Sequence, residues 1–180
     1  MTTAGLVLAA GEGKRFGGPK APYVHNGQRL VDRAVQVLAE AGCDPVFVVL
    51  GAWLGDVPNA TVLENPNWAT GMGSSLQVGL KHLNGESEID EVLVSLVDLP
   101  GLTGTAVARV VNSPGEIVVA CYDGKRGHPV KFARSSWPEL SNSATGDQGA
   151  RSFIANHPDE IVLIEVGDVA TGEDMDERPS

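Results

Sequence analysis

The residues best suited to chemistry gather in one glycine-rich segment near the N-terminus. Residues 8–20 read LAAGEGKRFGGPK. Glycines let a backbone approach an anion closely and turn several N–H donors toward it. Arg15 and Lys20 add positive charge that would stabilise the charge developing on a departing pyrophosphate. The segment therefore favours a triphosphate-binding loop with catalytic Arg15 and Lys20. The alternative is a surface glycine turn with solvated cations.

Two familiar phosphate-binding loops do not fit this segment. A P-loop requires Lys and then Ser or Thr after its last glycine, but here Pro19 follows Gly18. A Rossmann fingerprint requires G-x-G-x-x-G opening a helix, whereas Gly17 comes one residue late and Pro19 interrupts any helix. The L-A-A-G-x-G-x-R…K loop of nucleotidyltransferases fits without adjustment. Six of its residues are predicted to bind nucleotide: Leu8, Ala9, Ala10, Gly11, Gly13 and Lys14.

A carboxylate with a metal-binding environment is predicted at Asp98, which follows an apolar run and precedes Leu99-Pro100. A carboxylate there can hold Mg²⁺ between an α-phosphate and an acceptor, as phosphoryl-type transfer requires. A turn or helix-capping aspartate is the alternative. The glycine-rich segment also follows a predicted strand, so both should lie at the sheet edge where ligands bind. We therefore expect Asp98 to be catalytic and to bind the cofactor Mg²⁺.

A further anion site is expected near the start of a predicted helix at 74–83. Ser74 and Ser75 would bind nucleotide there through hydroxyl and backbone groups. Capping of the helix by either serine explains them nearly as well. Trp68, just before them, could stack on a base or pack in the interior.

Short apolar runs alternate with helical patterns, which places these residues on an α/β fold. Strands are expected at 6–10, 45–50, 61–63, 92–97, 117–120, 130–132 and 161–166, and helices at 30–41, 74–83, 105–111 and 149–155. A turn at residues 122–124 makes 117–132 antiparallel. The remaining order implies right-handed crossovers and a Rossmann-like three-layer sandwich with a mostly parallel sheet. The acidic tail, 173–177, is expected to be mobile.

Length and charge narrow the class of protein. The 180 residues, 42% of them hydrophobic, can bury one core, so we expect a single domain over 1–180. A formal net charge of −10 argues against nucleic-acid and anionic-membrane partners. Yet seven of the 13 basic residues fall within 14–20 and 125–134, which suggests a small anion bound locally. Without a signal-peptide pattern, a membrane-length apolar run or a disulfide-like cysteine pattern, a cytoplasmic protein is expected.

Several motifs in order along nearly the whole chain resemble the MobA/MocA-like nucleotidyltransferases, and most closely the molybdenum cofactor cytidylyltransferase branch. Besides the glycine-rich loop they are NPNW at 65–68, GMGSSL at 71–76, DLP at 98–100, GHPV at 127–130 and GDQGAR at 146–151. The resemblance implies the nucleotide-diphospho-sugar-transferase fold. It implies transfer of a nucleotidyl group to a molybdopterin-type phosphate with release of pyrophosphate, and a molybdoenzyme as a possible recipient of the product.

The resemblance also suggests roles for particular residues. It assigns Asp98 to the metal, and His128, Asp147 and Arg151 to the acceptor; a turn residue at His128 and a helix cap at Asp147 are the alternatives. The family often carries a DIDTPED-like segment, where this chain has DVATGED at 168–174. Because the second acid and the proline are missing, a solvated acidic tail is the better interpretation.

The residue before the first glycine of the loop bears on the base. The guanylyl-transferring branch resembles L-A-G-G, whereas this chain has L-A-A-G at 8–11, as in the cytidylyl branch. The extra methyl of Ala10 should crowd a purine more than a pyrimidine, so CTP is favoured over GTP.

Three other functions stay open. A nucleotidyltransferase for a sugar phosphate or polyol phosphate differs only in its acceptor. An NAD(P)- or flavin-dependent oxidoreductase, a name that some MocA-like chains carry, fits the glycine spacing poorly and leaves Arg15, Lys20 and Asp98 without a shared task. A non-catalytic carrier of molybdenum cofactor could keep the pocket without turnover.

Overall fold

A seven-stranded sheet forms the centre of the computed structural model, which describes residues 1–180. Its strands lie in the order β5-β4-β1-β6-β8-β7-β9. They are β1 (Thr3–Leu8), β4 (Val46–Leu50), β5 (Thr61–Glu64), β6 (Glu91–Leu96), β7 (Ile117–Tyr122), β8 (Lys125–Ala133) and β9 (Ile161–Glu165). Only β8 runs antiparallel to its neighbours, and all the other pairs are parallel. The expected excursion at 117–132 is therefore confirmed.

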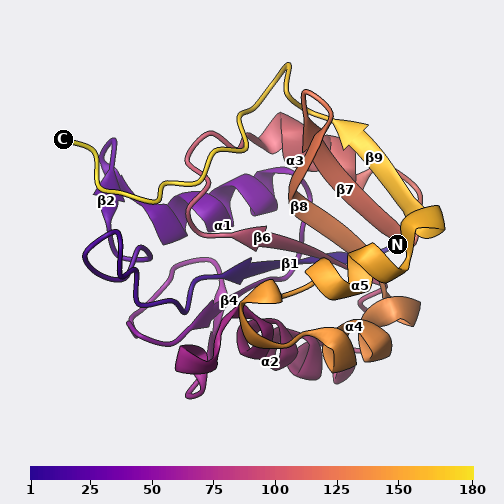
Figure 1. Cartoon of the computed structure of the whole chain (residues 1–180), viewed down its shortest axis with the longest axis horizontal. Helices are drawn as coiled ribbons and strands as arrows, with labels where there is room; N and C mark the ends of the chain where they lie inside the picture. Colours follow the sequence, from indigo (N-terminus) through magenta and orange to yellow (C-terminus); the bar gives the residue numbers. More distant parts are fainter.

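Helices cover both faces of this sheet, which confirms the three-layer sandwich (Figure 1). One face carries α1 (Leu30–Glu40) and α3 (Gly104–Val111), and the other carries α2 (Met72–Asn84), α4 (Trp137–Ser143) and α5 (Arg151–Asn156). Short 3₁₀ turns η1 (Trp68–Thr70), η2 (Arg134–Ser136), η3 (Gly146–Gln148) and η4 (Pro158–Glu160) lead into or out of helices. None of the helices combines the length and apolar character that crossing a bilayer requires.

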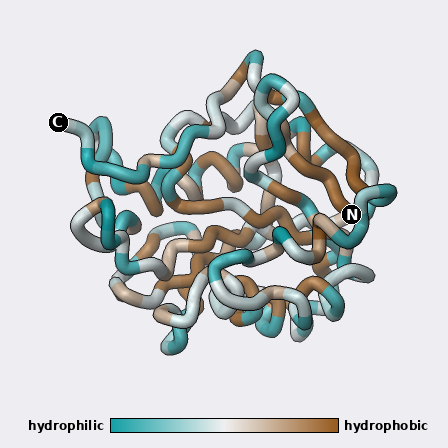
Figure 2. The backbone as a smooth tube through the Cα atoms, viewed as in Figure 1, coloured by the Kyte–Doolittle hydropathy of each residue, from teal (hydrophilic) through white to brown (hydrophobic).

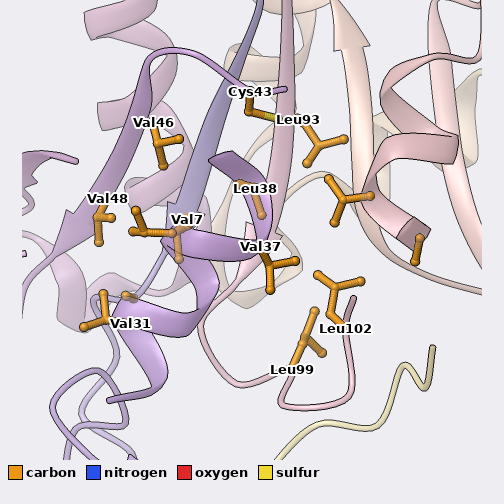
Figure 3. Packing of buried hydrophobic residues seen from close by; sticks show 14 of the residues in the cluster. Val7, Val31, Val37, Leu38, Cys43, Val46, Val48, Leu93, Leu99 and Leu102 are labelled. Atoms are coloured by element: carbon orange, nitrogen blue, oxygen red, sulfur yellow. The ribbon is translucent and has the colours of Figure 1, made fainter. Parts of the chain in front are cut away.

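Two hydrophobic cores hold the layers together, one on each side of the sheet. The core under α1 and α3 has 21 buried residues, and its strand and helix side chains interdigitate in Figure 3. The other, under α2, α4 and α5, has 20. Because alternate residues of β1 face opposite ways, Val7 enters the first core while Leu6 and Leu8 enter the second. Figure 2 shows the apolar strands inside and polar segments around them.

Three short elements were not predicted, namely two strands and a helix. Strands β2 (Val24–His25) and β3 (Gln28–Arg29), each of two residues, form a separate antiparallel hairpin before α1. Helix α4 has only seven residues and carries Pro138 in its first turn, where proline is tolerated. Its length is too short for a helical period to stand out in the sequence.

Two of the four cations in the second basic segment, 125–134, were interpreted wrongly as part of an anion-binding cluster. Lys131 is 1% exposed; its Nζ lies 3.0 Å from Glu91 and donates hydrogen bonds to the carbonyls of Val111 and Ser113. Arg134 donates to three backbone carbonyls and its guanidinium lies over the ring of Trp137. Lys131 is paired with a buried carboxylate, and Arg134 donates its N–H groups to backbone carbonyls. Neither cation is therefore free to bind an anion.

Candidate active site

Three adjoining cavities open along the edge where β1 and β6 end. Their volumes are about 400, 190 and 390 Å³. We call them the base cavity, the phosphate cavity and the acceptor cavity, in that order. Met72, the first residue of α2, lines all three, so they form one continuous cleft.

The glycine-rich loop lies along two of these cavities. All six loop residues predicted to bind nucleotide line the base or the phosphate cavity, namely Leu8, Ala9, Ala10, Gly11, Gly13 and Lys14. Gly13 has φ +63°, and its carbonyl accepts hydrogen bonds from the N–H groups of Gly17 and Gly18 at 2.8 and 3.0 Å. A side chain at Gly13 would collide with the carbonyl of Gly18, so glycine is required there.

The loop presents a row of free donors. The backbone N–H groups of residues 11–15 donate no hydrogen bond within the chain. Successive N–H groups without partners form a concave anion site, which is the geometry a triphosphate needs.

An ion pair joins two of the predicted catalytic residues across the phosphate cavity. Lys20 Nζ lies 2.7 Å from Asp98 Oδ2, and each side chain is 16% exposed. Lys20 follows the glycine loop and Asp98 follows β6, so the neighbouring parallel strands β1 and β6 bring the two together. Arg15 is placed differently: its side chain is 79% exposed, lines none of the three cavities, and lies 3.9 Å from Asp176.

The two predicted serines have separate roles. Ser75 lines the base cavity, whereas Ser74 lines none of the three and its hydroxyl donates to the carbonyl of Gly71. Neither caps the helix, because α2 begins two residues before Ser74, with Gly71 as its N-cap. The capping alternative was wrong because the helix begins two residues earlier than the apolar pattern indicates.

Asn65 was missed by sequence reasoning. It is 1% exposed, and its side-chain amide donates to the hydroxyls of Ser74 and Ser75 at 2.8 and 3.0 Å while its carbonyl oxygen accepts the N–H of Asn67. Asn65 thereby fixes the entry to α2. The NPNW motif that contains it was the available signal. Trp68 of the same motif lies in the wall of the base cavity.

The acceptor cavity brings together the residues assigned to the acceptor. His128, Asp147 and Arg151 all line it, together with Arg126 of the basic segment 125–134 and with Gln148, which was not predicted. Burial lowers the pKa of His128 to about 4; Asp98 opposes this and Arg151 reinforces it. The imidazole is therefore neutral at pH 7, and it can accept or donate a hydrogen bond without charge.

The acidic tail is solvated, as expected, since Glu173, Asp174, Asp176 and Glu177 are exposed, but it also contacts the cleft. The N–H of Met175 donates to the carbonyl of Asp98 at 2.9 Å, and the tail then runs on toward β2 (Figure 1). Asp174 lines the acceptor cavity, and Asp176 Oδ1 lies 3.6 Å from Lys20 Nζ. Burial raises the pKa of Asp174, and nearby Asp98 and Asp176 raise it further.

The donor set at Asp98 suits a cation that also takes ligands from its substrate. No group of three or more His, Cys, Asp or Glu side chains gathers into a closed metal site. Mg²⁺ in nucleotide enzymes is commonly held by one or two carboxylates, with phosphate oxygens and water completing its coordination. Asp98 with Asp174 close by offers that arrangement, so the residues present fit the ion.

The sequence is similar to those of known proteins over most of its length. The chain matches the MobA-like NTP transferase domain over residues 5–161. It is 39% identical to the nicotine blue oxidoreductase of Paenarthrobacter nicotinovorans, covering 96% of this chain and 91% of that protein. It is 29% identical to a probable molybdenum cofactor guanylyltransferase of Mycobacterium avium, covering 92% of this chain and 87% of the relative.

Solved structures of mycobacterial Rv0371c proteins share the fold. The homologue from Mycobacterium sp. strain JC1 superposes with a TM-score of 0.80 at 24% identity, covering 96% of this chain and 90% of that one. Rv0371c of Mycobacterium tuberculosis H37Rv, solved in complex with manganese, gives a TM-score of 0.73 at 23% identity, with 92% of this chain and 89% of that one covered. The fold is therefore that of the nucleotidyltransferases. By the match over residues 5–161, the chain belongs to the MobA-like NTP transferase family.

Proposed function

We propose that this enzyme transfers CMP from CTP to a molybdopterin-type phosphate, releasing pyrophosphate, with Mg²⁺ as cofactor. The observation that carries the proposal is the continuous cleft: a loop of free N–H donors, the Lys20–Asp98 pair and an acceptor cavity with two arginines meet at Met72. The named guanylyltransferase relative supports the acceptor class.

In this reaction an oxygen of the acceptor phosphate attacks the α-phosphorus in line, the bond to the β-phosphate breaks, and pyrophosphate leaves with the electron pair. The free N–H groups of the loop and Lys20 stabilise the charge on the departing group. Arg126 and Arg151 hold the acceptor phosphate close to the α-phosphorus. Asp98, with Asp174 nearby, would hold Mg²⁺, whose charge offsets that of the phosphates.

The neutral imidazole of His128 can hydrogen-bond the acceptor beside these arginines, while Asp147 contributes to both the base and the acceptor cavities. A molybdoenzyme would receive the product, and the reaction would take place in the cytoplasm.

CTP is the proposed donor because Ala10 lines the base cavity and is 5% exposed. One methyl group discriminates between ligands by only about 1–3 kcal/mol, so Trp68 and Ser75 must contribute as well. With both triphosphates at equal concentration, we expect more cytidylate than guanylate in the product. Ala10→Gly should reduce the preference for cytidylate over guanylate. Preferential guanylate transfer by the unaltered enzyme would overturn the choice of CTP and leave the reaction class unchanged.

The decisive experiment measures labelled pyrophosphate released from β,γ-labelled CTP in the presence of molybdopterin and Mg²⁺. Release that requires the acceptor supports the proposal. Nucleotide binding without release would instead indicate a carrier, and release with a sugar phosphate or polyol phosphate in place of molybdopterin would change the acceptor.

A second candidate, an oxidoreductase using NAD(P)H, is favoured by the 39% identity to nicotine blue oxidoreductase. Hydride transfer would need the nicotinamide in the acceptor cavity and would give the Lys20–Asp98 pair no chemical step. Oxidation of NAD(P)H, followed by its absorbance with an oxidised dye as acceptor, separates the two candidates. Dye-dependent oxidation without pyrophosphate release from CTP would favour the oxidoreductase.

A further inference from the structure

The C-terminal tail contributes a contact to the nucleotide loop that the reaction scheme above does not use. Beyond Met175, Arg178 reaches the backbone of the loop at Phe16 and Gly17. Its Nε donates to the carbonyl of Phe16 at 3.1 Å, and one terminal nitrogen donates to that of Gly17 at 3.4 Å. These bonds join residues 161 and 162 positions apart in the chain.

Two aromatic rings hold the guanidinium in place. Its central carbon lies 5.3 Å from the ring centre of Phe16 and 5.6 Å from that of Tyr23. The two rings meet edge to face, with centroids 4.8 Å apart. A planar guanidinium over aromatic faces gains cation–π attraction and loses little freedom when it also donates hydrogen bonds.

The Phe16 ring connects this contact to the catalytic lysine. Phe16 is buried, and the Nζ of Lys20 lies 5.8 Å from the centre of its ring. Arg178, Phe16 and Lys20 therefore form one row from the tail to the phosphate cavity.

The loop has few other restraints over this stretch. Among residues 11–18, only the N–H groups of Gly17 and Gly18 donate backbone hydrogen bonds, both to the carbonyl of Gly13. The donors that would meet the phosphates, at residues 11–15, are unpaired. With so few internal bonds, the loop depends on contacts from other segments to keep its shape, and Arg178 supplies two of them.

We propose that Arg178 is a positioning residue that holds the glycine-rich loop and Phe16 in the conformation that binds the triphosphate. The inference rests on the proposed function in naming the triphosphate as ligand, whereas the support of the loop by Arg178 stands on the contacts alone. Arg178 touches no reacting atom; it acts through Phe16 and the loop backbone.

The first measurement needs no nucleotide. Trypsin cuts after Lys14 and Arg15, whose side chains are exposed, at a rate that follows how often the loop opens. Arg178→Ala should raise that rate about fivefold. Arg178 itself is followed by Pro179 and is a poor trypsin site, so the substitution removes no competing cut.

The second measurement uses pyrophosphate release at varied CTP. Arg178→Ala should raise KM for CTP about tenfold and change kcat less than about twofold, because a charge-assisted contact to the ligand's loop is lost while the reacting groups remain. Arg178→Lys keeps the charge but not the planar fork, so it should fall between the wild type and the alanine variant in both measurements.

Glu177→Ala is the matched control, since Glu177 is the neighbouring exposed residue and makes no hydrogen bond or ion pair within the chain. It should behave as wild type in both measurements. Trypsin cleavage of Arg178→Ala at the wild-type rate would overturn the proposal, and so would faster cleavage with an unchanged KM. If the wild type releases no pyrophosphate, the proposed function fails, while the cleavage rates still decide whether Arg178 holds the loop.

Discussion

At the scale of single residues, the Lys20–Asp98 ion pair is the feature of the cleft that bears most directly on catalysis. Both side chains are largely buried, 2.7 Å apart, and line the phosphate cavity together. A salt bridge in such a place adds little to stability, because the cost of desolvation offsets most of the attraction. Its position beside free loop donors suggests instead that phosphate and metal take over these partners when nucleotide binds.

Asp98→Asn should lower Mg²⁺-dependent pyrophosphate release by at least about 100-fold, because an amide is a poor ligand for a hard cation. If Asp98 only shapes a turn, asparagine substitutes well there and turnover persists. The comparison is made with equal amounts of folded protein, checked by thermal unfolding. Turnover within a few-fold of wild type would remove the metal from Asp98.

Lys20→Ala and Arg15→Ala should both slow the reaction, but not equally. Lys20 lies inside the phosphate cavity, so its loss should raise the barrier by about 2–4 kcal/mol. Arg15 is mostly exposed, and solvent screens its charge, so a cost of about 1 kcal/mol is expected. Rates of pyrophosphate release at saturating CTP give both numbers. Equal losses would mean that Arg15 moves into the cleft when nucleotide binds.

At the scale of elements, the cleft depends on the contact between the start of α2 and the η3 turn. Gly71 has φ +114°, and an added Cβ would lie 2.5 Å from the carbonyl carbon of Gly146 and 2.7 Å from Asp147 Oδ1. The helix N-terminus, with its partial positive charge, is thus pressed against a residue of the acceptor cavity. This close approach sets the position of Asp147, which lines both the base and the acceptor cavities.

Gly71→Ala should destabilise the protein by about 2 kcal/mol or more, through backbone strain and the clash with η3. It should also weaken nucleotide binding, because Asp147 is displaced from the cavities it lines. Gly104→Ala is the control: Gly104 begins α3, and its added Cβ would meet nothing closer than 3.6 Å. Thermal unfolding of both variants tests this, and equal midpoints would contradict the packing argument.

Some elements of the fold and the site could be predicted from the sequence, and others could not. Strands β1, β4 and β6 were predicted because they are buried on both faces, which forces continuous apolar runs. The glycine loop was predicted because its residues are neighbours in the chain. The contacts of Asp174, Asp176 and Arg178 were not, since charged residues near a terminus suit solvent equally well and their partners lie far away in sequence. Lys131 was misinterpreted for a similar reason: its buried partner, Glu91, lies on another strand.

At the scale of the whole molecule, one sheet separates the two cores, and the cleft opens at the edge of that sheet. The two cores share the strands of that sheet, so neither half can unfold without exposing apolar residues of the other. This continuity supports a single domain over residues 1–180.

Unfolding should therefore be a single cooperative transition. Calorimetry should give equal calorimetric and van't Hoff enthalpies, and CTP with Mg²⁺ should shift the whole transition upward by mass action. A first transition insensitive to CTP, followed by a second that responds to it, would indicate two units rather than one.

Met72 borders all three cavities, and this has a consequence for how two substrates would meet. Methionine is flexible and polarizable, so its thioether adapts to whichever ligand arrives first and changes the wall that the second one finds. Donor and acceptor affinities would then be thermodynamically linked, and by reciprocity each ligand would alter the other's dissociation constant by the same factor. A branched, stiffer side chain at this position would uncouple them, turning a concerted pair of binding events into two independent ones.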